Sequence, residues 1–104
     1  MSVSTAFALF MKEAPAHAAA WSQAAQALGA ASSLDAKTQA LSYLAVLAAI
    51  GNTAGVPFHA QAARDLGATR QEVASAVLIG LPAAGATVIA SLPAALAAYD
   101  APSA

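Results

Sequence analysis

Cysteine is absent from this sequence of 104 residues, and charged residues make up only 9% of it. The absence of cysteine excludes disulfides, thiolate metal sites, iron–sulfur clusters and every thiol-based reaction. The basic residues are Lys12, Lys37, Arg64 and Arg70, and their scattered positions cannot form the basic stripe that nucleic-acid binding requires. We therefore expect neither thiol chemistry nor a nucleic-acid partner.

Apolar residues dominate the rest of the chain: 60% of the residues are hydrophobic, and about a third are alanine. This is the reverse of a disordered composition, so we expect one folded domain over residues 1–104. The uncharged stretches 40–58 and 73–99 are long enough to cross a bilayer. However, glycine and proline interrupt both, and neither has flanking basic clusters or aromatic belts. The first residues also lack a signal-peptide pattern. We therefore expect a cytoplasmic protein with no membrane partner, and a small membrane protein is the lowest-ranked alternative.

The alanine content, with few β-branched runs, favours helix almost throughout and predicts an all-α bundle. A first helix is expected over residues 4–13. Pro15 suits the first turn of a second helix, which we expect to end near Gly29, with this glycine as a left-handed cap. Ser33 or Asp35 can then cap a third helix, which extends to about residue 50. This third helix is apolar around most of its circumference, so we expect it to be central.

Gly51 is expected to end the third helix. Because proline is tolerated only in the first turn, Pro57 places the start of the next helix between Asn52 and Val56. Gly67 is expected to end that helix. The sequence therefore predicts a short bend between two helices, and this bend contains the most informative residues of the chain.

Thr69 and Glu72 match the capping box, in which each side chain satisfies a backbone amide at the start of a helix. The last helix is expected over about residues 84–98, with a kink at Pro93, and residues 100–104 are expected to form a frayed tail. Together these signals predict about five or six helices.

The order of motifs along the chain resembles that of a known family. The motifs here are Leu34-Asp35-Ala36-Lys37-Thr38, an alanine-rich helix, Gly51–His59, and then Gly67-Ala68-Thr69 with Glu72-Val73. They resemble the carboxymuconolactone decarboxylase family, which includes the AhpD-like alkylhydroperoxidases and carries L-D-x-K-T, C-x-x-C-x-x-x-H and G-A-T-x-x-E-[VI]. The resemblance covers residues 13–99. It implies an AhpD-like helical bundle that assembles into homo-oligomers, typically trimers or hexamers.

The positions at which this chain differs from the family pattern are the ones that carry the family's redox chemistry. The two cysteine positions of the motif correspond to Asn52 and Gly55, and the histidine corresponds to His59. The glutamate that relays protons in redox members corresponds to Ala40. Since neither Asn52 nor Gly55 can supply a thiolate, we do not expect peroxiredoxin-type activity from this chain.

His59 is the candidate catalytic residue, because an imidazole that titrates near pH 6.5 can transfer protons at neutral pH. Members of the family that decarboxylate a lactone need proton transfer rather than a dithiol. Asn52 and Tyr43 are candidate substrate-binding residues. Arg64 lies roughly 140° around the helix from His59, so we expect it to point away, although it could reach the site of a neighbouring subunit. Backbone amides near residues 55–57 could also favour an anion.

Each candidate residue also has a structural interpretation. His59 could be a relic that hydrogen-bonds locally and packs beside Phe58, Asn52 could be a cap or turn residue, and Tyr43 could belong to the core or to an interface. We expect His17 and Trp21, four residues apart, to form a packed pair on the surface.

Metal and cofactor sites are not expected. Two histidines and five widely spaced carboxylates make a metal site within one subunit improbable, and no nucleotide-binding motif is present. Whether the chain is an enzyme stays open at this point. One hypothesis is acid–base chemistry by His59 on a small carboxylated or lactone substrate. The alternative is a catalytically silent protein that binds a small molecule or acts through oligomeric interactions.

Overall fold

A computed structural model describes residues 3–102 of the chain, and these residues form helices and no strands, which confirms the all-α prediction. The α-helices are α1 (Thr5–Glu13), α2 (Pro15–Ala31), α3 (Ala36–Ala49), α4 (Val56–Asp65), α5 (Arg70–Leu78), α6 (Leu81–Ala84) and α7 (Leu92–Asp100). Two 3-10 segments, η1 (Thr53–Gly55) and η2 (Gly85–Ser91), connect α3 to α4 and α6 to α7.

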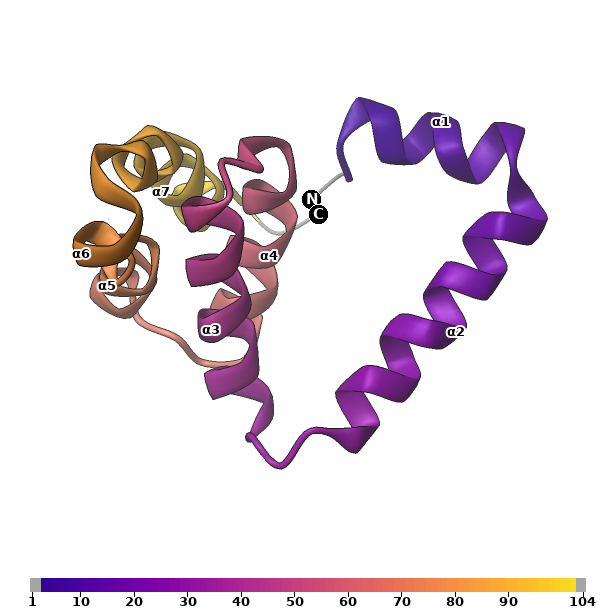
Figure 1. Cartoon of the computed structure of the whole chain (residues 1–104), viewed down its shortest axis with the longest axis horizontal. Coiled ribbons are helices and arrows are strands. Elements are labelled where there is room, and N and C mark those ends of the chain that lie inside the picture. Colours follow the sequence, from indigo (N-terminus) through magenta and orange to yellow (C-terminus); the bar gives the residue numbers. More distant parts are fainter. Residues whose placement is uncertain (1–2, 103–104) are drawn as a thin grey trace.

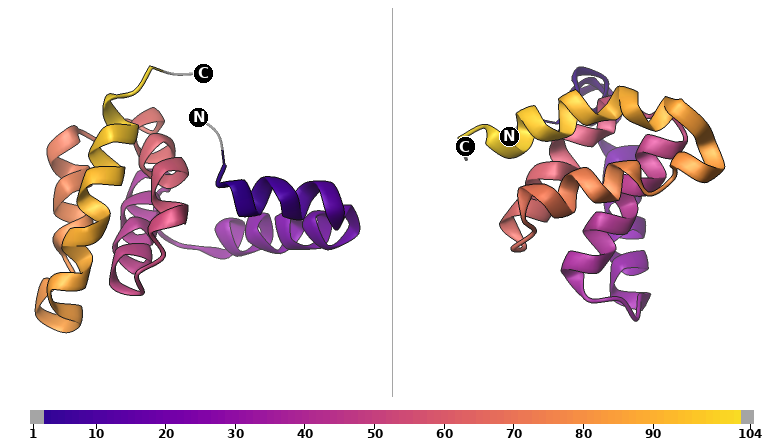
Figure 2. Two further views of the ribbon diagram at one scale, coloured as in Figure 1. Left: turned by 90° about the horizontal axis from the view of Figure 1, so that it is seen from above. Right: turned by 90° about the vertical axis from the view of Figure 1, so that its left-hand side faces the viewer.

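The helices form two parts, an arm of α1 and α2 and a body of α3–α7, which diverge from the loop before α3 (Figure 1). In the body, α3 packs against α4 and α5, and α7 packs against α4 and α5 in turn. Alanine, valine and leucine side chains fill the core, with Leu44, Val56, Val73, Val77 and Val88 completely buried. The left view in Figure 2 shows the arm projecting from one side of this body.

Side-chain caps and glycines set most helix ends where the sequence predicts them. The Asp35 carboxylate accepts a hydrogen bond of 2.8 Å from the Thr38 amide at the start of α3. Gly51 and Gly67 follow α3 and α4 with φ of 75° and 96°, a conformation that glycine adopts without strain. Thr69 and Glu72 form the predicted capping box at the start of α5.

The prediction that Gly29 caps α2 in a left-handed conformation is wrong, although the helix ends near this residue. Gly29 lies inside the helix, which continues to Ala31, and Ser32 is the extended residue that ends it. Alanine is the strongest helix former, so the two alanines after Gly29 offset the low helix propensity of a single glycine.

The prediction of one last helix over residues 84–98 with a kink at Pro93 is also wrong. Gly85, with φ of 78°, separates α6 from η2, and Pro93 lies in the first turn of α7 rather than in its middle. The expected tail starts later than predicted, because Asp100 still belongs to α7 and accepts two hydrogen bonds of 2.9 Å from Arg70. Residues 103–104 of that tail lie outside the described residues.

The run Arg70–Asp100 is long and apolar enough to cross a membrane by length and composition, with a mean hydropathy of 2.0 in a window that is 17% buried. In the structure this run is divided into α5, α6, η2 and α7, and α5 and α7 pack against each other. A nine-residue helix such as α5 or α7 is about 14 Å long, roughly half the thickness of the hydrocarbon core.

Candidate functional site

The candidate site lies where α3, η1 and α4 meet, on the bend that the sequence predicts. The Gly51 turn reverses the chain after α3, and α4 then begins at Val56 with Pro57 in its first turn. A bond of 3.5 Å between the hydroxyls of Thr53 and Ser91 links η1 to the buried end of η2. This link fixes the bend against the body. No sequence motif indicates it, because the two residues are 38 positions apart.

The two positions that carry cysteine in redox members are neighbours in this fold. The Asn52 side-chain nitrogen lies 3.6 Å from the place that a β-carbon on Gly55 would occupy. The Leu47 side chain comes within 3.4 Å of the same place. The fold thus keeps the two positions together, whereas an exposed amide and a glycine packed against leucine have replaced the residues that redox chemistry needs.

His59 is half-buried and has aromatic neighbours. Its ring lies edge to face against Tyr43 of α3, with 4.6 Å between the ring centres and 62° between the ring planes. Phe58 contacts it in the same manner at 5.2 Å. Burial lowers the pKa of His59 below its ordinary value of 6.5, so the ring is mainly neutral at pH 7.

Within residues 3–102, the His59 ring forms aromatic contacts with Tyr43 and Phe58 and no hydrogen bond. His59 therefore lies beside Phe58, as its structural interpretation expects, but it lacks the local hydrogen bond of that interpretation. An imidazole without such a bond keeps both nitrogens available, one as donor and one as acceptor.

The structure brings Tyr43 to His59, and among the described residues it forms no hydrogen bond between His59 and Asn52. Asn52 is exposed, and its side chain forms no cap on η1. Its backbone amide donates to the Leu47 carbonyl at 2.9 Å. The Asn52 side chain is thus a hydrogen-bonding group at the rim of the site rather than a fixed part of the bend.

Arg64 is held by the end of α7. Its Nη1 donates to the carbonyl of Tyr99 at 2.9 Å and to that of Ala101, and its side chain is only 18% exposed. Both acceptors are C-terminal carbonyls of the type that an α-helix leaves unsatisfied. Arg64 therefore caps the C-terminal end of α7, and this structural role accounts for its positive charge without any bound substrate.

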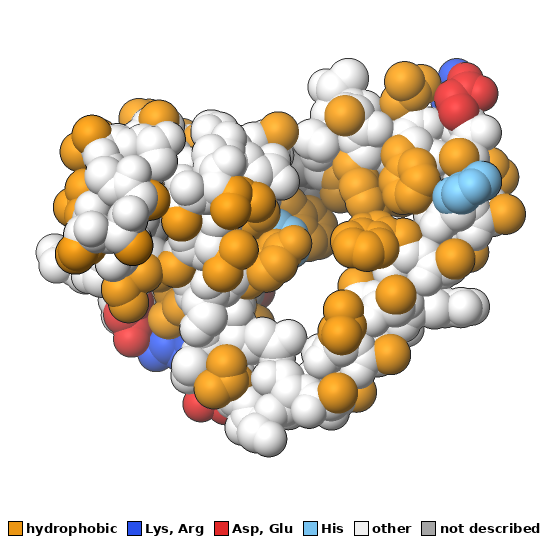
Figure 3. Space-filling view, in the orientation of Figure 1, with side chains coloured by type: hydrophobic (Ala, Val, Ile, Leu, Met, Phe, Trp, Pro, Cys, Tyr) orange, Lys and Arg blue, Asp and Glu red, His pale blue; other side chains and the backbone are white. Residues whose placement is uncertain are grey.

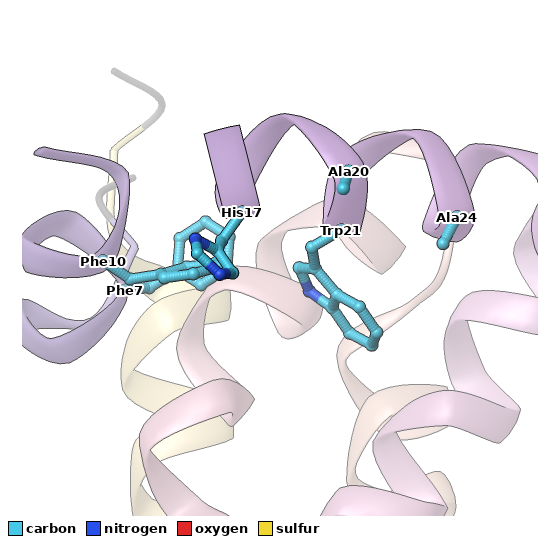
Figure 4. A pocket seen from close by; sticks show the side chains of 6 residues that line it. All are labelled: Phe7, Phe10, His17, Ala20, Trp21 and Ala24. Carbon is cyan, nitrogen blue, oxygen red and sulfur yellow. The ribbon is translucent and has the colours of Figure 1, made fainter. Parts of the chain in front are cut away.

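Two hollows on the surface are lined by other residues. One lies along the arm, and Figure 4 shows its lining from α1 and α2: Phe7, Phe10, His17, Ala20, Trp21 and Ala24. His17 and Trp21, the predicted surface pair, are both exposed there. The other hollow is bordered by α3 and α5. Residues 3–102 contain no group of three His, Cys, Asp or Glu side chains that could hold a metal ion.

The model of the carboxymuconolactone decarboxylase family matches residues 15–100, which is most of the chain. No curated protein and no solved structure matches the chain. Because the family model matches residues 15–100, this cysteine-free chain belongs to the carboxymuconolactone decarboxylase family.

Proposed function

We propose that this chain is a non-redox member of the family in which His59 transfers a proton on a small lactone acid. The observation that carries the proposal is the state of the His59 ring, which is half-buried, lowered in pKa and without a hydrogen-bond partner in the described residues. A neutral imidazole with a free acceptor nitrogen is a general base at pH 7.

The chemistry requires no thiol. Neutral His59 takes a proton from the carbon next to the lactone carbonyl, and the electron pair of the broken C–H bond moves to the carbonyl oxygen as an enolate. The imidazolium then returns a proton to that carbon or to a conjugated one. Loss of carbon dioxide from carboxymuconolactone leaves the same kind of enolate, which likewise needs a proton.

Two neighbouring side chains can support this reaction. Because Tyr43 contacts the imidazole edge to face, a substrate held at His59 also meets the Tyr43 side chain. The exposed Asn52 amide can donate to a carboxylate. Arg64 is not assigned to the substrate, because its guanidinium binds the end of α7.

The test is hydrogen–deuterium exchange at the carbon next to the carbonyl, followed by NMR in D2O. The probe is an enol-γ-lactone with a carboxymethyl substituent. We expect His59→Gln to reduce the exchange rate by about 100-fold or more, as for loss of a general base. Lys37→Gln, which changes a side chain that pairs with Glu72 of α5, is the control and should exchange at the wild-type rate. Equal rates for wild type and His59→Gln, with unchanged helicity, would contradict the proposal.

A catalytically silent binding protein is the second candidate. It is favoured by the aromatic side chains beside His59, since Tyr43 is 44% exposed and Phe58 is 43% exposed. This candidate predicts that the lactone acid shifts the NMR signals of His59 and Tyr43 without any exchange. A peroxide assay with a dithiol donor should give only background turnover under either candidate.

A further inference from the structure

The arm has almost no core of its own. Of the residues in α1 and α2, Ala18 is the one that is buried. Isolated helices of this length are marginal in water and depend on packing of an apolar face. The arm therefore needs a partner surface to be a stable part of the folded protein.

An apolar stripe runs along one side of the arm. His17, Trp21, Ala24 and Leu28 follow helical spacing and lie on one face of α2. Trp21 is 52% exposed and Leu28 is 68% exposed. Figure 4 shows Phe7 and Phe10 of α1 extending this face beside His17. We call this surface the arm stripe.

A second stripe runs along α3 of the body. Tyr43, Val46 and Ile50 share one face of α3, and Val46 and Ile50 are 52% and 69% exposed. Gln39 continues this face, and its side-chain nitrogen lies 3.6 Å from the place of a β-carbon on Gly29 of α2. The face therefore points to the side of the body on which the arm lies. We call Tyr43, Val46 and Ile50 the body stripe, and His59 of α4 lies against its first residue.

The two stripes do not cover each other within one chain. The space-filling view shows an open space between arm and body, with hydrophobic side chains on both sides of it (Figure 3). A short loop before α3 separates the two parts, and in it the Leu34 amide donates to the Ser32 hydroxyl at 3.1 Å. Neither stripe contains a charged residue, so each suits an apolar partner.

The exposed area indicates how large the missing partner surface is. The chain exposes 6226 Å². A compact monomer of its mass, 10.1 kDa, would expose about 5,300 Å² by the usual size relation. The excess is about 900 Å², close to the area of roughly 800 Å² that each partner buries in a standard protein interface.

We infer that a second copy of this chain covers the body stripe with its arm, and that the arm stripe of the first copy covers the second copy in the same way. Such an exchange is two-fold symmetric, so both stripes of both copies are buried by one closed contact. The partner's arm then lies over Tyr43 and His59 and closes the candidate site.

Trp21 reports on this contact directly, because it is the one tryptophan of the chain. We expect the wild-type chain without detergent to have the mass of two chains or a multiple of it, by light scattering. Its Trp21 emission should be blue-shifted and protected from acrylamide. Val46→Glu, on the body stripe, should give single chains with an accessible Trp21, although the substitution is not on the arm. Ile79→Glu, at a 71% exposed position outside both stripes, is the matched control and should keep Trp21 protected.

Several results would overturn the inference. The first is a wild-type protein with the mass of one chain. The second is a Val46→Glu protein that still assembles and keeps Trp21 protected. The third is a Trp21 that is protected only when phosphatidylcholine vesicles are present. Circular dichroism checks the helicity of each variant. If Val46→Glu does not fold, Leu28→Glu on the arm replaces it. A Leu28→Glu protein with the mass of one chain then supports the contact, and one that still assembles contradicts it. None of these measurements uses a substrate, so they fail or succeed independently of the proposed proton transfer.

Discussion

Replacing Arg64 by methionine tests whether this cation serves the fold or a substrate. The substitution keeps an unbranched apolar side chain and removes the guanidinium. It therefore deletes the two hydrogen bonds that Nη1 donates to the carbonyls of Tyr99 and Ala101. Because these carbonyls lie at the C-terminal end of α7, loss of the two bonds removes a connection between α4 and this end of α7.

The expected destabilisation follows from the kind of bond and its exposure. A hydrogen bond from a charged donor contributes about 1.5–3 kcal/mol when it is buried. The Arg64 side chain is 18% exposed and the carbonyls lie at a helix end, so water can replace part of the lost interaction. We expect Arg64→Met to lower the free energy of unfolding by about 1.5–3 kcal/mol in total.

The assay is urea unfolding followed by circular dichroism at a fixed chain concentration, with Arg70→Met as the control. Arg70 also binds the end of α7, through Asp100, but it is 53% exposed, so we expect a clearly smaller loss of stability. If Arg64→Met unfolds at the wild-type urea concentration while lactone exchange is lost, Arg64 is a substrate ligand and our assignment of it is wrong.

Three further substitutions test other parts of the structure. Burial lowers the pKa of His59, so the unfolded chain binds a proton more readily than the folded chain does. The free energy of unfolding should therefore fall as the pH drops from 6.5 through the folded pKa. His59→Leu should remove this part of the pH dependence, which urea titrations at pH 7.5 and 5.5 measure. Thr69→Ala should cost about 0.5–2 kcal/mol through loss of the capping box, whereas Thr69→Ser should retain most of the stability. Leu44→Ala should cost about 2–5 kcal/mol because Leu44 is completely buried, and an equal effect of Ile79→Ala, which is exposed, would contradict the assigned core.

Features that depend on neighbouring residues could be predicted from the sequence. The Asp35 cap, the Gly51 and Gly67 ends and the Thr69–Glu72 box each involve a contact within four residues, so local pattern determines them. The Gly29 prediction failed for a related reason: a glycine marks a helix end only when the residues after it cannot continue the helix, and here two alanines can.

Features that depend on distant residues could not be predicted. The contact between Tyr43 and His59 requires the packing of α3 on α4, and the bonds of Arg64 reach residues 35 and 37 positions away. The separation of arm and body is similar, because helical spacing reveals an apolar stripe but does not reveal which surface covers it. The family motif located His59, and packing then determined its aromatic surroundings and its lowered pKa.

The central claim is that His59, in place of a thiol, performs the chemistry of this chain. The pH dependence of deuterium exchange into the enol-γ-lactone acid tests it most directly. We predict that the exchange rate is highest at pH above 6.5, falls as the pH drops through the folded pKa of His59, and is lost in His59→Gln. Exchange that is independent of pH between 5 and 8, or that persists in His59→Gln, would contradict the account.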